Sequence, residues 1–341
     1  MKTILVTGGA GFMGSNFVDH VRRNFPDYRV WVLDLLTYAG NPRNLAQHQE
    51  GERFKFWYGN IRNAELVNDL MAKSDVVVHF AAETHVSRSL YDTVTCFETQ
   101  VLGTQCLANA MLKHSERTKL FIHISSSEVY GSVEYSPMDE NHPLNPTSPY
   151  AGAKCGADRL LYSYWITYGL PVVLVRPFNN YGPRQHLEKV IPRFITSAIV
   201  GEPLTVHGDG SNTRDWLWVE DTARAVAKLM ETDPKKVAGE AVNLGTDREI
   251  SVLEIAKMVL ARVGKPESLL RYMVERPGQV KRHHSSTEKA ARLIDWKADM
   301  RFEEGLDRTI EWYQKNRGWW EPQLWMRTIP VHTEDGRTVF Y

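Results

Sequence analysis

Three glycines near the N-terminus constrain the fold of this 341-residue chain more than any other feature. Gly8, Gly11 and Gly14 follow an apolar run at residues 4–6 with the composition of a buried parallel strand, and a helix is expected from about Ser15. In such a strand–turn–helix unit, the first glycine makes the tight turn, the second lets the backbone approach a pyrophosphate, and the third lets the helix pack on the strand. The spacing therefore predicts an α/β fold that binds a dinucleotide.

An acidic residue at the end of the second expected strand indicates which dinucleotide. Strand 29–33 is followed by Asp34, twenty residues after Gly14. An acid at this distance accepts hydrogen bonds from ribose hydroxyls and repels a 2′-phosphate, so the pattern favours NAD over NADP. The predicted cofactor-binding residues are Gly8, Gly11, Phe12, Met13, Gly14, Asp34, Thr37, Asn60, Ile61, Ala81, Ala82, Tyr150 and Lys154.

Strand-like and helix-like segments alternate along the first half of the chain. Strands are expected at 3–7, 29–33, 54–58, 75–79, 120–124 and 171–175, with helices near 15–24, 63–72, 98–114 and 148–168. This alternation predicts a doubly wound parallel (Rossmann) sheet with ligands at the carboxyl ends of its strands. From about residue 180, prolines and glycines cluster. We therefore predict an NAD-binding domain over 1–180 that carries the catalytic residues, and a smaller mixed lobe over 181–341 that mainly binds substrate and is interleaved with the end of the sheet.

The composition argues against several classes of protein. The formal net charge is +0 and no basic stripe stands out, so nucleic acid is not expected as a partner. No apolar run reaches the ~18 residues of a membrane span, and Met1 leads directly into the first strand, which leaves no room for a signal peptide. Cys96, Cys106 and Cys155 are too few and too scattered for a disulfide framework or a zinc site, so no metal is expected. Together these features predict a cytoplasmic protein.

A second group of reactive residues lies between 124 and 154. Tyr150 precedes Lys154 by four residues, which places both side chains on one face of a helix. A free tyrosine titrates at about 10, and a neighbouring ammonium together with a positively charged nicotinamide favours the phenolate. Tyr150 could then deprotonate a substrate hydroxyl, with Ser126 hydrogen-bonded to the same oxygen. Glu128 adds a carboxylate, which suits an enzyme that also removes a proton from carbon.

Taken together, these motifs resemble the extended short-chain dehydrogenases that act on nucleotide sugars, and most of all the 4,6-dehydratases, with the dTDP-glucose group as the nearest. The resemblance runs from Met1 to about Trp312. Beyond the glycines and the Tyr–Lys pair, it is carried by the segments 34–41, 79–89, 179–183, 188–192, 214–216 and 276–278. The resemblance implies bound NAD and a nucleotide-sugar substrate.

The resemblance also implies which residues hold the substrate. They are Thr84, Ser87, Arg88, Asn179, Asn180, Lys189, Val190, Arg214, Asn243 and Arg276. Planar guanidinium groups suit the oxygens of a diphosphate, and the chain offers five candidates for that role. They are Arg184, Arg193, Arg214, Arg276 and Arg282, of which Arg214 is preferred and Arg276 is next.

The reaction of the resembled family is an internal redox cycle. It implies that Tyr150 takes the proton of the sugar 4-hydroxyl while a hydride passes from C4 to NAD. Glu128 then takes the C5 proton, the 6-hydroxyl leaves as water, and the hydride returns to C6 to give a 4-keto-6-deoxy sugar. The implied catalytic residues are Ser126, Ser127, Glu128, Tyr150 and Lys154. The family usually dimerises through two long helices of each subunit, for which 98–114 and 148–168 are the candidates.

One position departs from the dTDP-glucose group, which has Thr-Asp-Glu where this chain has Ser126, Ser127 and Glu128. A serine hydroxyl is a poor proton donor, so Ser127 could only relay a proton or position a water. GDP-mannose 4,6-dehydratases carry Thr-Ser-Glu, which keeps dehydration open. The Ser–Glu pair also resembles UDP-glucuronate decarboxylases, which need a cation for the substrate carboxylate, here Lys281 or Arg282. A 4-epimerase on the same scaffold is a further alternative, against which Glu128 argues.

The Trp-rich segment 312–341 allows two interpretations. It could pack as a strap over the C-terminal lobe, or it could form an oligomer contact.

Overall fold

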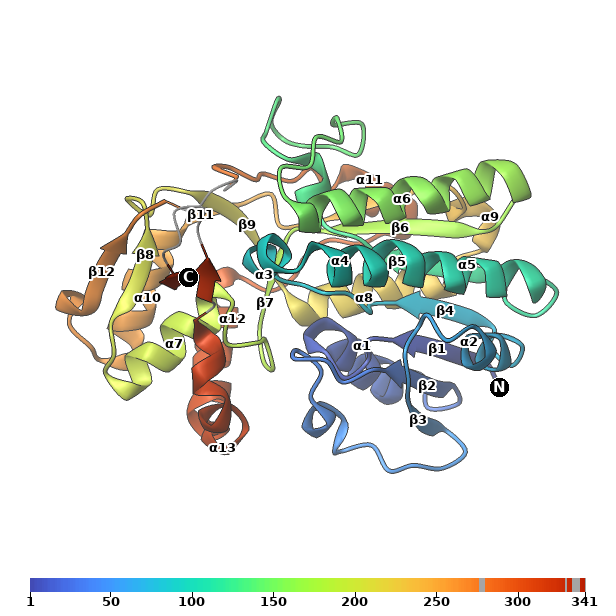
Figure 1. Ribbon diagram of the computed structural model, residues 1–341, viewed down its shortest axis with the longest axis horizontal. Coiled ribbons are helices and arrows are strands. Elements are labelled where there is room, and N and C mark those ends of the chain that lie inside the picture. Colours follow the sequence, from blue (N-terminus) through green and yellow to red (C-terminus); the bar gives the residue numbers. More distant parts are fainter. Residues whose placement is uncertain (276–279, 329, 333–337, 341) are drawn as a thin grey trace.

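A seven-stranded sheet is the largest element of the computed structural model, which describes residues 1–275, 280–328, 330–332 and 338–340. All neighbouring strands in this sheet are parallel, in the order β10-β6-β5-β4-β1-β2-β3 (Figure 1). The strands are β1 (Thr3–Thr7), β2 (Arg29–Asp34), β3 (Phe54–Tyr58), β4 (Val76–His79), β5 (Leu120–Ile124), β6 (Val172–Pro177) and β10 (Ala241–Leu244). This is the Rossmann-like doubly wound arrangement that the alternating pattern predicted.

Helices cover both faces of the sheet and so form two apolar cores. Successive residues of a strand point alternately into one core and the other. Ile4 and Val6 belong to the core beneath α1, α8 and α11, whereas Leu5 belongs to the core beneath α2, α5 and α6. Because both faces are buried, the strands carry almost continuous apolar residues. The helices are α1 (Phe12–Asn24), α2 (Ala64–Met71), α5 (Thr104–Lys113), α6 (Pro149–Tyr168), α8 (Val219–Glu231) and α11 (Glu288–Ile294).

Most predicted boundaries agree with the structure within two residues, but the first helix begins earlier than expected. It starts at Phe12 rather than near Ser15, so Gly14 lies within its first turn. A Cβ on Gly14 would stand 2.2 Å from the Gly8 carbonyl oxygen, which explains the glycine at this position. The helix expected from residue 98 is also longer: α3 (Val86–Tyr91), α4 (Thr93–Phe97) and a π-helical turn η2 (Glu98–Gly103) precede α5.

The smaller lobe lies beside the large sheet, on the left in Figure 1, and has its own apolar core. Its strands are β7 (Asn179–Tyr181), β9 (Thr213–Trp218) and β11 (Glu249–Ser251) in one sheet, and β8 (Leu204–His207) with β12 (Leu270–Met273) in another. Its main helices are α7 (Val190–Val200), α10 (Val252–Val263) and α12 (Phe302–Lys315). Strand β10 and helices α8 and α11 come from the same half of the chain, yet they pack with the large sheet. The second half therefore contributes to both parts.

The remaining elements are short. They are α9 (Pro234–Val237), α13 (Arg317–Trp320), β13 (Pro330–His332), β14 (Thr338–Phe340) and the 3-10 turns η1 (Pro42–Leu45), η3 (Ser127–Tyr130), η4 (Glu267–Leu269) and η5 (Glu321–Arg327).

The Trp-rich segment packs within the chain as far as residue 327. Trp320 is fully buried and its indole N–H donates to the Tyr313 carbonyl at 2.7 Å. Trp319 donates to Asn44 Oδ1 at 2.9 Å, so the strap also ties the smaller lobe to the first half of the chain. Trp325 remains 72% exposed.

Two other predictions concern the whole chain. All three cysteines lie in the described part, and none of them forms a disulfide. Across the residues that the structure describes, no helix combines the length and the apolar character needed to cross a membrane.

Candidate active site

A cavity of about 270 Å³ opens at the carboxyl ends of β1 to β6. The loops that follow these strands line it, as expected for a doubly wound sheet. Every residue predicted to bind the cofactor lies on its wall: Gly8, Gly11, Phe12, Met13, Gly14, Asp34, Thr37, Asn60, Ile61, Ala81, Ala82, Tyr150 and Lys154. Glu83, Gln185 and His186 line it as well, and the sequence had not assigned them to the cofactor.

The glycine turn leaves room for a pyrophosphate at one end of this cavity. Gly8 has φ +70°, and a Cβ there would lie 2.5 Å from the backbone nitrogen of Ala81. Gly11 is the N-cap of α1 and adds no side chain above the first turn. The first N–H groups of a helix have no partner inside the helix, and with the positive end of the helix dipole they attract phosphate.

Asp34 fits the ribose of a bound dinucleotide. Its Oδ2 accepts a hydrogen bond from the Ala10 N–H at 2.9 Å, and its Oδ1 accepts one from the Leu36 N–H at 2.8 Å. Burial raises the pKa of Asp34, and these two N–H groups oppose that rise. An ionised carboxylate has about four acceptor positions, so two remain for ribose hydroxyls. The residues present therefore fit NAD.

The catalytic side chains predicted from the sequence come from two elements beside the cavity. Ser126 caps the turn η3 after β5, while Tyr150 and Lys154 lie one turn apart on α6. Ser126 hydrogen-bonds to Tyr150, and Lys154 Nζ donates to the Ile124 carbonyl at 2.8 Å. Helix α6 begins at Pro149 because the Ser148 side chain accepts a hydrogen bond from the Ala151 N–H.

Burial shifts both catalytic groups on α6 toward their neutral forms. It raises the pKa of Tyr150 well above its ordinary value, and it lowers the pKa of Lys154 to about 8. The Ser126 hydrogen bond opposes the first shift, and Asp158, one turn beyond Lys154, opposes the second. Tyr150 is therefore a phenol unless more positive charge is added beside it, and a bound nicotinamide would add such charge.

A second cavity of about 200 Å³ adjoins the first, since Asn179 and Lys189 line both. Glu128 lines the second cavity, and its charge acts on the Tyr150 hydroxyl. The predicted residues Ser87, Val190 and Arg214 lie on the same wall. The carboxylate and the tyrosine thus line adjoining cavities and lie near enough for the charge of one to act on the other.

Basic side chains concentrate on the wall of the second cavity. Lys189, Arg193 and Arg214 line it, which suits a diphosphate. Arg214 is buried, and its guanidinium donates to the carbonyls of Thr213 and Val280, which fixes its orientation.

Two other candidate arginines form ion pairs within the protein. Arg184 pairs with Asp19 at 2.7 Å, and Arg282 forms a bidentate pair with Glu249. Arg276 lies outside the described residues.

Three predicted substrate residues make their contacts within the protein. Arg88 donates to Glu188 at 2.8 Å and stacks over the Tyr38 ring. It therefore ties α3 to the residue just before Lys189, which lines both cavities. The Thr84 carbonyl accepts a hydrogen bond from Lys189, and Thr84 lines the first cavity rather than the second. Asn180 also lines the first cavity, with its amide bonded to Thr222 and Phe178.

Asn243 lines neither of the two cavities, although it was predicted to bind substrate. It is fully buried on β10, where its Oδ1 accepts from the Tyr130 hydroxyl at 2.6 Å and its amide N–H donates to the Met138 carbonyl at 3.1 Å. Both ends of the amide are therefore satisfied inside the protein. This position does not fit the predicted role of Asn243 as a substrate ligand.

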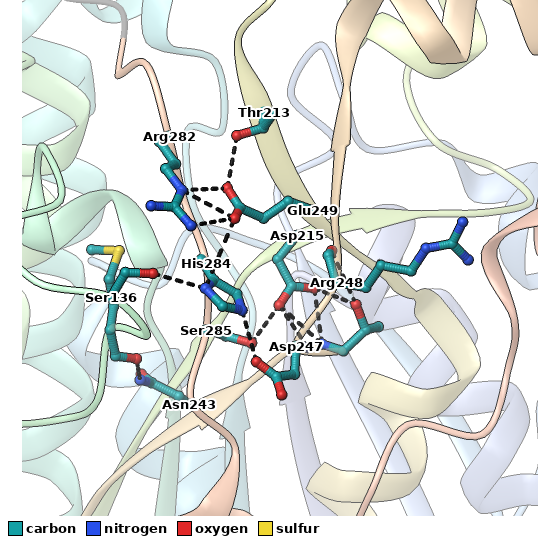
Figure 2. Close-up of polar contacts among 12 residues, drawn as sticks. Ser136, Thr213, Asp215, Asn243, Asp247, Arg248, Glu249, Arg282, His284 and Ser285 are labelled. Carbon is teal, nitrogen blue, oxygen red and sulfur yellow. Dashed lines mark hydrogen bonds and ion pairs between the residues drawn. The ribbon is translucent and has the colours of Figure 1, made fainter.

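A polar network holds the segment 280–285 in place next to the second cavity (Figure 2). The Arg282–Glu249 pair fastens it to β11, and the Ser285 hydroxyl donates to the buried carboxylate of Asp215 on β9. His284 bridges Asp247 and Ser136, at 2.7 and 2.8 Å respectively. These contacts fix the side-chain orientations of Arg282, His284 and Ser285.

Some wall residues of the second cavity could not be recognised from the sequence. His207 and Asn212 lie there because β8 packs against α7 and Asn212 directly precedes β9. No local motif marks them, since their positions depend on how the lobe packs.

Known proteins similar to this chain include nucleotide-sugar 4,6-dehydratases. A family model described as GDP-mannose 4,6 dehydratase matches residues 5–309. A dTDP-glucose 4,6-dehydratase from Streptomyces niveus is 42% identical over 323 residues, covering 94% of this chain and 95% of the relative. A trifunctional UDP-glucose 4,6-dehydratase/UDP-4-keto-6-deoxy-D-glucose 3,5-epimerase/UDP-4-keto-L-rhamnose-reductase from Arabidopsis thaliana is 39% identical over 94% of this chain and 48% of that protein.

The crystal structure of DesIV, a dTDP-glucose 4,6-dehydratase from Streptomyces venezuelae with NAD and dTDP bound, superposes with a TM-score of 0.90. The two chains are 40% identical, over 94% of this chain and 99% of that one. The chain therefore belongs to the GDP-mannose 4,6 dehydratase family, among the extended short-chain dehydrogenases that its motifs predicted.

Proposed function

We propose that this NAD-dependent nucleotide-sugar 4,6-dehydratase acts on a hexose carried by a nucleoside diphosphate, with dTDP-glucose as the first candidate. The relatives are named for dTDP-glucose and, in the plant protein, for UDP-glucose. The observation that carries the proposal is the position of Glu128, which lines the second cavity while Ser126, Tyr150 and Lys154 line the first. A carboxylate at that junction serves a reaction that removes a proton from carbon as well as oxidising an alcohol.

The proposed division of labour follows the two cavities. NAD, when bound, accepts a hydride from C4 of the sugar and returns it to C6. Tyr150 takes the proton of the 4-hydroxyl, Ser126 holds the same oxygen, and Lys154 keeps positive charge beside the phenolate. The C4 ketone acidifies the C5–H bond, and Glu128 takes that proton as the 6-hydroxyl leaves as water. Lys189, Arg193 and Arg214 provide positive charge for the diphosphate.

The two alternatives are less well supported. A UDP-glucuronate decarboxylase would need a cation for the substrate carboxylate, and Lys281 and Arg282 were the candidates. Both are exposed and neither lines the first or the second cavity, while Arg282 is paired with Glu249. A 4-epimerase would leave Glu128 without a role. Dehydration gives Glu128 a role that epimerisation does not, and it needs no cation for a substrate carboxylate.

We also propose that the protein forms a homodimer through α6 and the helical stretch from α3 to α5. Helices α4 and α6 pack against each other and against η2. This region exposes a group of large apolar side chains, each between 40% and 66% exposed: Leu90, Val94, Phe97, Leu102 and Ile166. Apolar patches of this kind mark protein–protein interfaces. The double variant V94E/F97E should sediment as a monomer where the parent protein sediments as a dimer, and a monomeric parent protein would contradict the proposal.

Two broader expectations remain proposals. Residues 1–180 form the NAD-binding part with the catalytic residues, and residues 181–341 mainly bind the nucleotide sugar. The position of Lys189, Arg193 and Arg214 on the second cavity supports this division.

We propose the cytoplasm as the location, and the three free cysteines are consistent with a reducing compartment.

A panel of substrates tests the proposed function. The purified protein is incubated separately with dTDP-glucose, UDP-glucose, GDP-mannose, UDP-N-acetylglucosamine and UDP-glucuronate, and the products are weighed by mass spectrometry. Loss of one water from a neutral sugar is expected, and the sugar that reacts identifies the nucleotide. Loss of carbon dioxide from the glucuronate alone would replace the dehydratase proposal with the decarboxylase.

A further inference from the structure

Ser127, the residue that stands where the dTDP-glucose group has an acid, contacts a buried histidine. The Ser127 hydroxyl lies 3.3 Å from Nδ1 of His283, and both residues are at most 2% exposed. Its neighbours in the chain, Ser126 and Glu128, line the first and the second cavity respectively. Ser127 itself lines neither cavity, but it lies in the chain between two residues that do, directly behind the junction where the sugar is proposed to react.

The backbone holds His283 in this direction from both sides. Its N–H donates to the Thr213 carbonyl at 3.2 Å, and the next carbonyl along, that of His284, accepts from the Met138 N–H at 2.8 Å. The neighbouring side chains of Arg282 and His284 point to the polar network of Figure 2. The Phe178 ring packs edge-on against the imidazole. The histidine has little freedom to turn away from Ser127.

The hydrogen bonds of His283 suit both of its protonation states. Nε2 lies 3.1 Å from the Gly131 carbonyl, which can only accept, so Nε2 carries a hydrogen. In the neutral imidazole, Nδ1 accepts from the Ser127 hydroxyl. In the imidazolium, Nδ1 donates to the same oxygen, and the serine hydrogen turns elsewhere. A proton can therefore enter or leave the pair with every hydrogen bond kept.

We propose, on the basis of the dehydratase function proposed above, that His283 and Ser127 together replace the missing carboxylic acid. His283 is a positioning residue that supplies a proton to the departing 6-hydroxyl through the Ser127 hydroxyl. The transfer between His283 and Ser127 needs no displacement of either backbone, because the two side chains are already in contact.

The proton transfers balance over one turnover. Glu128 takes the C5 proton, the C5–H electron pair becomes the C5–C6 double bond, and the C6–O bond breaks. The departing oxygen takes the Ser127 proton, Ser127 takes the Nδ1 proton of the His283 imidazolium, and water leaves. Glu128 returns its proton to C5 when C6 receives the hydride. His283 regains a proton from solvent, and Tyr150 releases to solvent the proton that it took from the 4-hydroxyl.

A change of leaving group tests the relay. Fluoride is a far weaker base than hydroxide, so a 6-deoxy-6-fluoro substrate loses its leaving group without help from an acid. His283→Gln should lower kcat about 100-fold on dTDP-glucose, or on the hexose that the panel identifies, but no more than about threefold on its fluoro analogue. The variant should also accumulate reduced cofactor, seen by its near-ultraviolet absorbance, because C4 oxidation is intact. Equal losses on both substrates, or no loss on either, would overturn the proposal.

Companion variants separate the relay from a structural role. Ser127→Ala should reproduce the substrate-dependent loss, and S127A/H283Q should be no slower than either single variant. S127D/H283Q supplies a carboxylic acid directly and should recover the rate on the hydroxyl substrate to within about tenfold of the parent protein. His284→Gln, the neighbouring histidine bonded to Ser136 and Asp247, is the matched control. It should affect both substrates equally.

These variants cover the case in which H283Q does not fold, since Ser127→Ala then decides the question by the same ratio of rates. Failure of the proposed function is distinguishable, because the parent protein would then dehydrate none of the sugars. Failure of the relay appears only in the variants.

The pH profile gives a second readout. Burial lowers the pKa of His283, Glu128 raises it, and Arg214 and His142 lower it further. With the imidazolium as the active form, kcat on the hydroxyl substrate should fall as the pH rises through this lowered pKa. H283Q should lose that dependence, and retention of it would contradict the relay.

Discussion

At the scale of single residues, the proposed reaction depends most on Glu128. Tyr150, Lys154 and Ser126 are sufficient to oxidise an alcohol, and they line the cofactor cavity. Glu128 lines the adjoining cavity, beside the place where the sugar is proposed to bind. In the proposed mechanism, its carboxylate is the base for a C–H bond that the ketone at C4 has made acidic.

Replacing this carboxylate should separate the two halves of the reaction. Glu128→Gln keeps the size of the side chain but removes the base, so the variant should still oxidise C4 and lose overall turnover by about 100-fold or more. Exchange of the C5 hydrogen with deuterated solvent, followed by mass spectrometry of recovered substrate, measures the lost step. Unchanged exchange would show that another group removes the C5 proton.

Lys154 carries a cost in stability that its role in catalysis explains. Burial lowers its pKa from 10.5 to about 8, so the folded protein binds this proton less tightly than the unfolded chain does. The difference amounts to roughly 3 kcal/mol. This loss of stability is complete below about pH 8, where Lys154 is charged in both the folded and the unfolded chain. It shrinks as the pH rises and is gone above 10.5, where Lys154 is neutral in both.

Lys154→Met should therefore stabilise the cofactor-free protein while it abolishes activity. We expect a gain of about 1–2 kcal/mol in the free energy of unfolding at neutral pH, because loss of the bond to the Ile124 carbonyl offsets part of the benefit. Urea unfolding at pH 7 and at the highest pH that the protein tolerates measures this gain. A gain that does not shrink as the pH rises would contradict the account.

At the scale of helices and strands, the sequence predicted the first six strands and four helices closely because each has a strong apolar pattern between clear turn residues. The predicted start of α1 was wrong by three residues, because the glycine pattern assigned Gly14 to the turn although it lies inside the helix. The strand β10 was not recognised. Its partner is β6, some 67 residues earlier in the chain (Val242 pairs with Val175), and such a pairing leaves no local pattern.

Two glycine-to-alanine changes test the explanation of α1. Gly14→Ala places a Cβ 2.2 Å from the Gly8 carbonyl and 2.9 Å from Gly9 Cα, so the glycine turn must shift. We expect a loss of about 1–3 kcal/mol in stability and a loss of bound NAD. Gly152→Ala, inside α6 with open space around the new Cβ, is the control and should add about 0.5–1 kcal/mol. Thermal unfolding and the cofactor content of the purified variants measure both effects.

At the scale of the whole molecule, the site is formed where two parts of the chain meet. The first cavity belongs to the large sheet, and the second is closed by α7, β8 and β9 of the smaller lobe. The cofactor wall could be predicted because its residues follow strands in a recognisable motif. The contact between Ser127 and His283 could not, because 156 residues separate them and only the packing of the lobe brings them together.

The internal redox cycle requires that the hydrogen on C4 be transferred to C6, which neither epimerisation nor decarboxylation requires. If the nucleotide sugar carries deuterium at C4, the label must move to C6 of the same molecule, because the cofactor takes it from one carbon and returns it to the other. We expect nuclear magnetic resonance of the product to show the deuterium in the C6 methyl group of a 4-keto-6-deoxy sugar. Deuterium that returns to C4, or that is lost to solvent, would contradict the assignment of 4,6-dehydration.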